Sequence, residues 1–418
     1  MRITLALAGS RGDVQPALAV ALELRRRGHD VTTGVPPNLL ALADELGLDP
    51  LPLGVDSGEV LRSDLVRSGL RSRHPVRRIA AVRSILTHGW EDLRTGLEPL
   101  AKDADVVVTG LLGQQVGSAV AEASGSGFAT LHYCPVRSNT SAGIPMRSPA
   151  VQRFAWAVGE GARWRLTRAA ETEVRAALGL PAPSTNLPTR LWETGAVEVQ
   201  AYDPALLPGL AEEWGSSRPL TGFLTLAEED RALLGEGGVD DDLAAWLAAG
   251  EPPVYVGFGS MPVRDPAHLL DAVAVATAAL GRRALVSAGW NTFGDTDAVP
   301  AHVRVVGPID HAAVFPRCAA LVHHGGAGTT AAGLRAGRPT VIGYYSGDQP
   351  HWGTLLARRG VGTRLAARRI DRDSLREALS TVLEPGVEER CAELQRQLVQ
   401  PADAVRAAAD AVLTAAAR

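Results

Sequence analysis

The run HHGGAGTT, residues 323–330, carries the most specific chemistry in the sequence. It follows the apolar residues 319–322 and opens a helical pattern. Glycines let the backbone approach a ligand closely, and a helix start offers unpaired N–H groups at the positive end of its dipole. A diphosphate suits this arrangement, with His324 as a charged donor and Thr329 as a hydroxyl donor. The alternative is a tight strand-to-helix turn whose glycines serve packing alone.

A second polar pair, Asp348-Gln349, follows the apolar run 340–342. Loops at the carboxyl ends of parallel strands line the ligand crevice of open α/β sheets. Adjacent Asp and Gln side chains offer paired contacts to neighbouring sugar hydroxyls. Because Asp before Pro350 is also a good helix start, Asp348 is equally interpreted as an N-cap.

Two further motifs end strands of the same half. GFGS, residues 257–260, places Ser260 where its hydroxyl can donate to a phosphate. Trp290 ends SAGW, residues 287–290, where an exposed indole can stack on a nucleobase or simply plug the edge of the sheet.

The first half has its own candidate loop, GSRGD, residues 9–13. Asp13 is negative and would repel a phosphate, so it is better suited to act as a base, unless it is only an N-cap. The glycines do not form GxGxxG, so a Rossmann dinucleotide site is not supported. His132, at the end of a later strand, either orients reacting groups or is a satisfied structural histidine.

The elements that must position these residues alternate short apolar runs with helical stretches. This rhythm predicts an α/β fold with two doubly wound parallel sheets, Rossmann-like, in two similar halves facing a cleft. The predicted strands are Ile3–Ala8, Asp30–Val35, Val106–Thr109, Phe128–Leu131, Val254–Phe258, Ala284–Ser287, Val303–Val306, Leu321–His323 and Thr340–Ile342. The predicted helices are Pro16–Arg27, Asn38–Leu46, Val116–Ala123, Ala267–Ala279, Thr329–Ala336 and Ala402–Ala417.

The chain has 418 residues, 46% hydrophobic and 21% charged, with a net charge of −4. This composition predicts globular domains and no basic field for nucleic acid or an anionic membrane. Three scattered cysteines argue against disulfides and structural zinc. No apolar stretch reaches the roughly 18–20 residues of a membrane span, so a cytoplasmic protein is expected.

GSRGD, GFGS, SAGW, HHGGAGTT and GDQP, in this order over essentially the whole chain, resemble motifs of the glycosyltransferases that decorate glycopeptide antibiotic aglycones. Bacterial sterol glucosyltransferases and other natural-product transferases are similar more widely. The resemblance implies a GT-B architecture. We expect an acceptor-binding domain at 1–205, a linker at 206–222 and a nucleotide-sugar-binding domain at 223–401, with helix 402–418 packing back on the first domain.

The resemblance also implies residue roles. The diphosphate is held by His324 and by the following glycines and threonine, the base stacks on Trp290, and the sugar contacts Asp348 and Gln349. Ser10 and Ser260 flank the diphosphate, and Asp13, where many wider relatives have His, is the general base. The diphosphate-binding residues expected on these grounds are Ser10, Gly12, Ser260, His324, Gly326, Gly328 and Thr329.

The expected reaction is an inverting transfer from a UDP- or dTDP-sugar to a hydroxyl of a small lipophilic acceptor, with no metal and no other cofactor. The stretch 139–148 lacks the Pro/Tyr-rich run of the glycopeptide enzymes, which argues against a glycopeptide acceptor. His351 and Trp352 stand where relatives often show two aromatics. Two alternatives are a nucleotide-sugar epimerase and an inactive nucleotide-sugar-binding accessory protein. The sugar, the acceptor and the oligomeric state stay open.

Overall fold

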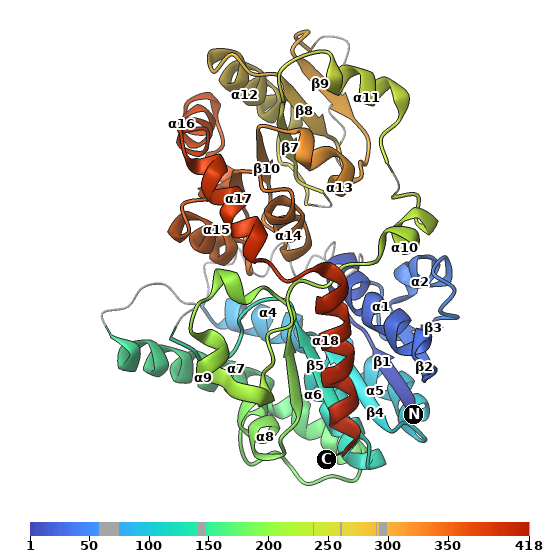
Figure 1. Cartoon of the computed structure of the whole chain (residues 1–418). Helices are drawn as coiled ribbons and strands as arrows, with labels where there is room; N and C mark the ends of the chain where they lie inside the picture. The colour runs from blue at the N-terminus through green and yellow to red at the C-terminus, as the bar shows by residue number, and fades with distance from the viewer. Residues whose placement is uncertain are drawn as a thin grey trace. The chain divides into compact units, whose positions relative to one another are not determined.

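The computed structural model describes residues 1–57, 75–140, 148–236, 238–259, 261–289, 291 and 299–417. The predicted site residues Ser260 and Trp290, and most of the stretch 139–148, therefore lie outside the described residues. No described helix is long and apolar enough to cross a membrane. The chain divides into two compact units (Figure 1). Unit 1 comprises residues 1–204, 208–230 and 399–418, and unit 2 comprises 205–207 and 231–398.

Unit 1 is built on a six-stranded sheet in which all neighbouring strands are parallel, in the order β3-β2-β1-β4-β5-β6. Ile3 of β1, for example, pairs with Val31 on one side and Val106 on the other, so the first strand lies at the centre. The strands are β1 (Arg2–Ala6), β2 (Asp30–Val35), β3 (Leu51–Pro52), β4 (Val106–Gly110), β5 (Gly127–His132) and β6 (Val197–Gln200).

Helices cover both faces of this sheet (Figure 1). The C-terminal helix packs on α1 and β6 and so belongs to unit 1, far along the chain from its neighbours. The helices of this unit are α1 (Arg11–Arg26), α2 (Leu40–Asp44), α4 (Pro75–Thr87), α5 (Trp90–Ala101), α6 (Gln114–Ser124), α7 (Pro149–Ala177), α8 (Leu187–Glu193), α9 (Leu210–Trp214) and α18 (Pro401–Thr414).

Unit 2 repeats the topology with six parallel strands in the order β12-β11-β10-β7-β8-β9. Its strands are β7 (Val254–Gly257), β8 (Ala284–Ser287), β9 (Val303–Val306), β10 (Ala320–His323), β11 (Thr340–Tyr344) and β12 (Gly362–Ala366). Its helices are α11 (Asp241–Ala248), α12 (Pro266–Ala279), α13 (His311–Val314), α14 (Ala327–Arg335), α15 (Gln349–Arg358), α16 (Arg372–Val382) and α17 (Val387–Gln397), with α10 (Glu228–Leu233) at the border of the two units.

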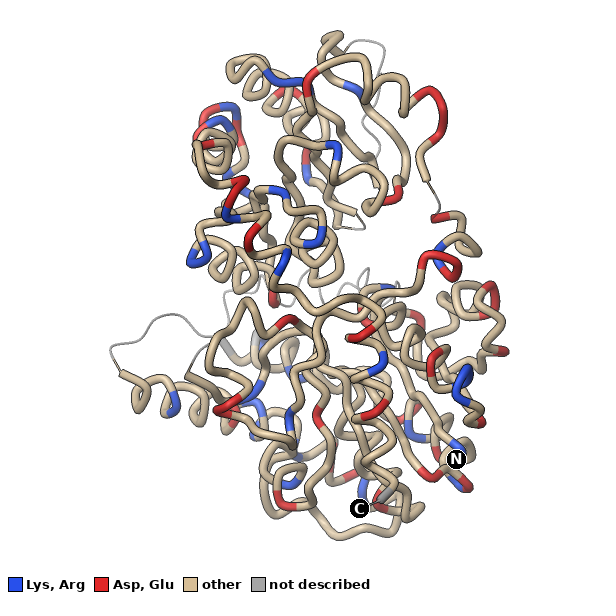
Figure 2. Tube along the Cα trace, viewed as in Figure 1, with Lys and Arg blue, Asp and Glu red and all other residues tan. Residues whose placement is uncertain are grey.

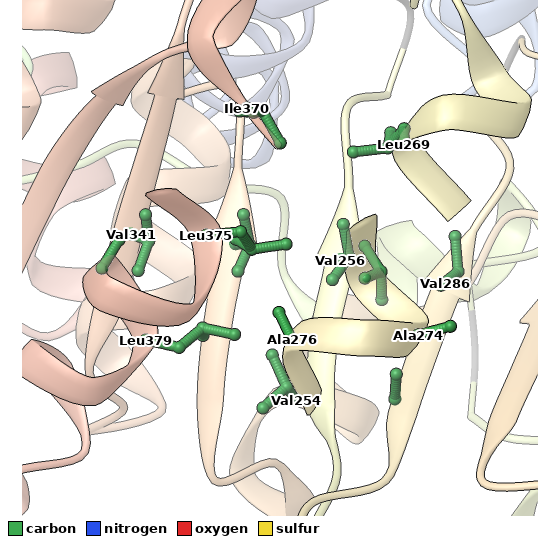
Figure 3. Close-up of a cluster of buried hydrophobic side chains, with 14 of the residues drawn as sticks. Val254, Val256, Leu269, Ala274, Ala276, Val286, Val341, Ile370, Leu375 and Leu379 are labelled. Carbon is green, nitrogen blue, oxygen red and sulfur yellow. The ribbon is translucent and has the colours of Figure 1, made fainter. Parts of the chain in front are cut away.

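The core of unit 2 follows from the alternation of side chains along its strands. Val254 and Val256 of β7 point to the face covered by α12 and α16, where they meet Leu375 and Leu379 (Figure 3). Tyr255, between them, belongs to the cluster on the opposite face with residues of α11 and α13. Burial on both faces explains the nearly continuous apolar runs, so the predicted doubly wound α/β fold is confirmed.

The helix predicted from Pro16 begins earlier, at Arg11, with Ser10 as its N-cap. Proline is favoured at the first helical position, where its missing N–H costs nothing. Pro16 lies instead in the second turn, and the polar side chains of the GSRGD loop start the helix. The N-cap interpretation of Asp13 was therefore wrong, because Asp13 occupies the third helical position.

The predicted linker at 206–222 is also wrong, because most of that segment packs into unit 1. Trp214 is buried and its Nε1 donates to the carbonyl oxygen of Ser138 at 2.9 Å. Thr221 N donates to the carbonyl oxygen of Gln200 at 3.0 Å, so this segment runs beside the end of β6. The Pro/Gly punctuation of this stretch marks turns of a packed segment. The chain passes between the units at 204–205, 207–208, 230–231 and 398–399.

Candidate functional site

The strand order of unit 2 reverses beside its first strand, because β7 lies between β8 and β10. Ligands of open α/β sheets bind at such a switch point, outside the carboxyl ends of the strands. The loops that follow β7, β8, β10 and β11 carry the GFGS, SAGW, HHGGAGTT and GDQP motifs. Topology therefore brings four motifs, scattered over about a hundred residues of sequence, to one edge of one sheet.

The glycines of these loops lie close to the neighbouring loops, and a side chain on Gly289 would collide with Gly259. A Cβ on Gly289 would lie 2.3 Å from the carbonyl oxygen of Gly259, and a Cβ on Gly259 would lie 3.6 Å from Cε1 of His324. A Cβ on Gly325 would lie 3.3 Å from Cβ of Gln349. Gly259, Gly289 and Gly325 have positive φ angles of 58°, 55° and 87°, which favour glycine. The loops thus converge around His324.

Helix α14 begins at this point without a side-chain cap. Its N-cap is Gly326, whose carbonyl accepts from Thr330 N at 2.9 Å, and no side-chain cap hydrogen bond is found among the described residues. A Cβ on Gly328 would meet nothing within 4 Å, so packing does not demand glycine there. Gly328 is exposed, and Thr329 beside it is half-buried. An open helix N-terminus with exposed glycine is suited to an anion.

His323 is buried and His324 is half-buried, and each has a buried ring nitrogen with no partner among the described residues. Nδ1 of His323 accepts from Gly325 N at 3.0 Å, which places the His323 proton on Nε2, a buried atom with no partner in the described structure. Nδ1 of His324 is likewise buried without a partner, and so is Oγ1 of Thr330. Buried polar atoms are nearly always hydrogen-bonded in proteins, so these three are groups that a water or a ligand can satisfy.

The charge expected on His324 is not supported. Burial lowers the pKa of His324 to about 4, so the ring is neutral near pH 7 and offers one N–H. Burial also lowers the pKa of His323 well below its usual value. Since the negative charge of a bound diphosphate favours the protonated form, the ring would gain charge only when the ligand is present.

Asp348 and Gln349 lie where β11 meets α15, and both are anchored from within unit 2. The carboxylate of Asp348 accepts from Nε1 of the fully buried Trp352 at 2.8 Å and makes no cap hydrogen bond, although it stands at the N-cap position. Burial raises the pKa of Asp348. Oε1 of Gln349 accepts from the N–H of Tyr345 at 2.7 Å, so the donors of this side chain are on its amide nitrogen.

Unit 1 presents a different group at its switch point, between β1 and β4. Oδ2 of Asp13 accepts from both N and Oγ of Ser10, each at 2.8 Å. Gly9 has a φ of 111°, and a Cβ there would lie 2.6 Å from Oδ2 of Asp13 and 2.9 Å from Leu112. The loop wraps the carboxylate, and the Ser10 hydroxyl that was expected on the diphosphate donates to Asp13 instead. Gly12 is exposed in the first turn.

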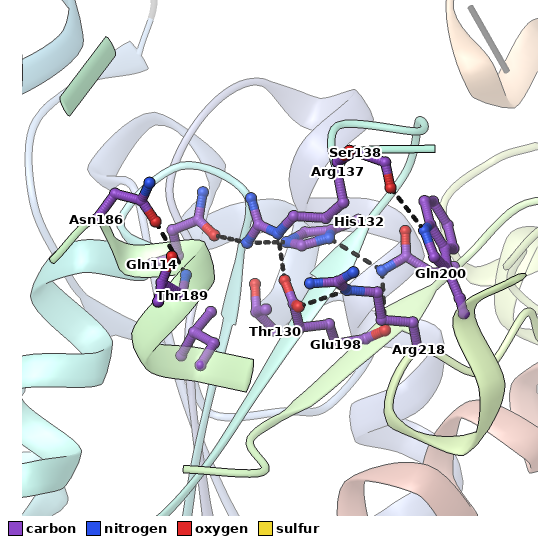
Figure 4. Close-up of polar contacts among 12 residues, drawn as sticks. Gln114, Thr130, His132, Arg137, Ser138, Asn186, Thr189, Glu198, Gln200 and Arg218 are labelled. Carbon is purple, nitrogen blue, oxygen red and sulfur yellow. Dashed lines mark hydrogen bonds and ion pairs between the residues drawn. The ribbon is translucent and has the colours of Figure 1, made fainter. Parts of the chain in front are cut away.

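His132 is a structural residue of a buried polar network (Figure 4). Its Nδ1 lies 3.2 Å from Nε2 of Gln200, and its Nε2 lies 3.4 Å from a guanidinium nitrogen of Arg137. Burial and the neighbouring arginines lower its pKa well below the usual value. Glu198 ties the network together by accepting from both Arg137 and Arg218. Full burial removes His132 as an alternative base.

Sequence reasoning missed this network, because its members lie on separate strands and loops with no local signature. It also missed His311, whose Nε2 lies 3.4 Å from the hydroxyl of Tyr255. Burial lowers the pKa of His311 to about 4, with a contribution from His324 nearby. Among the described residues, no group of three or more His, Cys, Asp or Glu side chains is arranged for a metal ion.

Two family models match the chain. Residues 3–128 match the glycosyltransferase family 28 N-terminal domain, and residues 272–406 match the erythromycin biosynthesis protein CIII-like C-terminal domain. An uncharacterized glycosyltransferase of Mycobacterium bovis is 41% identical over 422 residues, covering 100% of both chains. The chain belongs to the glycosyltransferases.

More distant similarity supports the same assignment. This glycosyltransferase is 30% identical over 427 residues to a sterol 3-beta-glucosyltransferase of Arabidopsis thaliana, covering 98% of the chain and 67% of the plant protein. Among solved structures, the glycotransferase of kitacinnamycin superposes with a TM-score of 0.72 at 20% identity, covering 99% of this chain and 98% of that one. The glycosyltransferase VinC in complex with dTDP gives 0.66 at 18% identity, covering 100% of both. These neighbours confirm the GT-B fold.

Proposed function

We propose that this glycosyltransferase moves a sugar from a UDP- or dTDP-sugar to a hydroxyl of a small lipophilic acceptor, with inversion at the sugar C1. Unit 2 holds the donor and unit 1 supplies the base. The observation that carries the proposal is the uncapped N-terminus of α14, with the unsatisfied Nδ1 of His324 beside it at the switch point of unit 2.

The donor assignment follows from the chemistry of that edge. Phosphate oxygens accept hydrogen bonds. The first-turn N–H groups of α14 and the His324 ring are hydrogen-bond donors that a phosphate at this helix start can use. By resemblance, Trp290 is assigned to the nucleobase and Ser260 to the phosphates. Asp348 and the amide nitrogen of Gln349 are assigned to sugar hydroxyls. The VinC structure with dTDP supports a nucleoside diphosphate as the ligand class.

The acceptor assignment rests on the similarity to a sterol 3-beta-glucosyltransferase, whose named substrate is a lipophilic alcohol. In the proposed reaction the acceptor oxygen forms a bond to C1 as the bond from C1 to the diphosphate oxygen breaks. Asp13 takes the hydroxyl proton, and the diphosphate leaves with its extra negative charge. His324 and the α14 N–H groups stabilise that developing charge, which is often the largest contribution to catalysis.

The orientation of Asp13 fits a base. Ser10 donates twice to Oδ2, which fixes the carboxylate by hydrogen bonds rather than leaving it to rotate.

The test has two stages. Melting temperature is measured with UDP, dTDP and their glucose conjugates, because a ligand that binds only the native state raises apparent stability. The stabilising donor is then incubated with and without cholesterol or another lipophilic alcohol, and the product is analysed by NMR. Acceptor-dependent transfer with an inverted anomeric bond supports the proposal. Donor isomerisation without acceptor would indicate an epimerase, and donor binding with neither reaction would indicate an accessory protein.

A further inference from the structure

The loop that follows β5 brings a tyrosine to the switch-point edge of unit 1. Tyr133 is the residue directly after β5, and β4 lies between β5 and β1. Thr109 of β4 pairs with Ala6 on one side and with Thr130 on the other, so the three strands end at the same level. The loops after β1, β4 and β5 therefore leave the sheet at one edge, where the loop that carries Asp13 also begins.

Contacts hold these loops in place. Gly9, in the loop after β1, has a φ of 111°, and a Cβ there would lie 2.9 Å from Cδ1 of Leu112, in the loop after β4. Leu112 is nevertheless 47% exposed. His132, the last residue of β5, is hydrogen-bonded to Gln200 and Arg137 (Figure 4). The edge thus combines a carboxylate, an exposed apolar side chain and a tyrosine that follows a fixed strand end.

The Tyr133 hydroxyl is a buried polar group with no partner among the described residues. The residue as a whole is half-buried. The other tyrosine of unit 1, Tyr202, donates from its hydroxyl to Oε1 of Gln200 at 2.8 Å. Buried hydroxyls are nearly always hydrogen-bonded in proteins, so the Tyr133 hydroxyl is a group that a ligand or a water can satisfy.

The phenol lies within electrostatic range of the proposed base. Burial and the negative charge of Asp13 both raise the pKa of Tyr133, so the hydroxyl keeps its proton near pH 7. The two Ser10 hydrogen bonds to Asp13 both end on Oδ2. A protonated phenol donates a hydrogen bond, and a carboxylate accepts one. The two groups together are therefore complementary to the oxygen and the proton of one alcohol.

We propose that Tyr133 orients the acceptor hydroxyl by donating a hydrogen bond to the oxygen whose proton Asp13 takes. This inference rests on the proposed function. One lone pair of the oxygen accepts from Tyr133, and the other forms the bond to C1 as the bond from C1 to the diphosphate oxygen breaks. The proton passes to the carboxylate. With the carbon substituent, these partners complete the tetrahedron around the oxygen, and Leu112 offers an apolar contact to that carbon skeleton.

The selection of an uncharged alcohol depends on such individual groups. In the described part of unit 1, basic and acidic residues are interspersed along the trace (Figure 2). Interspersed charges do not add up to an extended field of one sign that would attract a charged acceptor. A site that hydrogen-bonds a hydroxyl rejects an analogue that lacks it, because the polar groups of the site are then left unpaired. Tyr133 and Asp13 provide this selectivity.

The test compares Tyr133→Phe with the wild type in the full-length enzyme. The substrates are the alcohol that serves as acceptor and, as an inhibitor, its hydrocarbon without the hydroxyl, which for cholesterol is cholestene. The KM for the alcohol should rise about 2–10-fold, the scale of one neutral hydrogen bond. The kcat should fall about tenfold, because the hydroxyl is less well aligned. Inhibition by the hydrocarbon and affinity for UDP or dTDP should stay unchanged, which a merely structural role of Tyr133 would not produce.

Tyr202→Phe is the matched control, because it removes the other phenol hydroxyl of unit 1. It deprives Oε1 of Gln200 of a hydrogen bond, so its melting temperature should fall. Tyr133→Phe removes an unpaired hydroxyl and should melt no lower than the wild type. The control should keep the wild-type preference for the alcohol over the hydrocarbon.

Two results would overturn this inference alone. One is a folded Tyr133→Phe with the KM and kcat of the wild type, which would assign the hydroxyl to a bound water. The other is equal weakening of the alcohol and the hydrocarbon, which would make Tyr133 a packing residue. A wild type that binds donor but transfers sugar to no alcohol would overturn the proposed function, and this inference with it.

Discussion

Helices α1 and α14 begin beside the switch points of two sheets with the same strand order, but their N-termini are capped differently. In α1, the third helical residue, Asp13, accepts from N and Oγ of the N-cap Ser10. In α14, the N-cap is Gly326 and no side chain caps the helix. One helix start carries its own anion, and the other leaves room for an anion from outside.

The comparison teaches that topology sets where a ligand binds and the first-turn residues set what binds. A carboxylate at the start of α1 would repel a diphosphate, so that loop is suited to proton transfer. The neutral His324 and the open Gly328 position make α14 suited to the diphosphate. Four predictions can break or sharpen this contrast.

The largest effect is expected for Asp13→Asn. The amide oxygen can still accept from Ser10, so melting temperature and nucleotide affinity should stay near wild type. Turnover should fall about 10²–10⁴-fold, the range that general-base catalysis contributes. Steady-state kinetics, calorimetry and nucleotide titration measure the three quantities. A folded, donor-binding Asn variant with normal turnover would reduce Asp13 to a capping residue, and Asp13→Ala would then lower stability alone, by about 1 kcal/mol.

His324→Ala should weaken binding of UDP or dTDP by about 10–100-fold, the scale of a hydrogen bond to a charged group. Binding of uridine or thymidine should change little, because those ligands lack phosphate. His302→Ala is the matched control, since His302 lies before β9 at the opposite end of the sheet. Equal losses for nucleoside and nucleotide in calorimetric titrations would remove His324 from the phosphate site.

Acid should destabilise the protein chiefly through unit 2. Burial lowers the pKa values of His311, His324 and His351 to about 4, below the usual 6.5. The unfolded chain therefore binds more protons, and stability falls as pH drops from 6.5 toward 4, by at most about 1.4 kcal/mol per pH unit for each histidine. Above pH 6.5 these groups should have no effect. Melting curves of His351→Asn should show a shallower decline, and an unchanged decline would contradict the burial argument.

Gly328→Ala should give the smallest and most diagnostic effect. The new Cβ meets nothing within 4 Å, and alanine favours a helix over glycine by roughly 0.5–1 kcal/mol. The unliganded protein should therefore melt slightly higher. Nucleotide affinity should drop, because the methyl group occupies the space that a phosphate approaches. A variant that is more stable and binds nucleotide normally would show that Gly328 is not part of a phosphate site.

The sequence by itself determined the α/β class, the repeat of two halves and the order of the motifs. Apolar runs predict strands because burial on both faces of a parallel sheet requires them, as at Val254–Gly257. HHGGAGTT predicts a helix that begins without a side-chain cap, because a glycine has no side chain to supply one in any structural context. Helix α14 does begin within this motif. Such signals depend on neighbours along the chain.

Only the tertiary structure decided which contacts each residue makes. The start of α1, the anchoring of Asp348 by Trp352 and the burial of His132 among Gln200 and Arg137 depend on side chains that folding brings together. The expected linker at 206–222 became part of unit 1 because Gly222 packs against Val399 and Ala404, which come from the far end of the chain. Protonation follows the same rule, since desolvation of His324 arises from loops distant in sequence, and no local pattern encodes it.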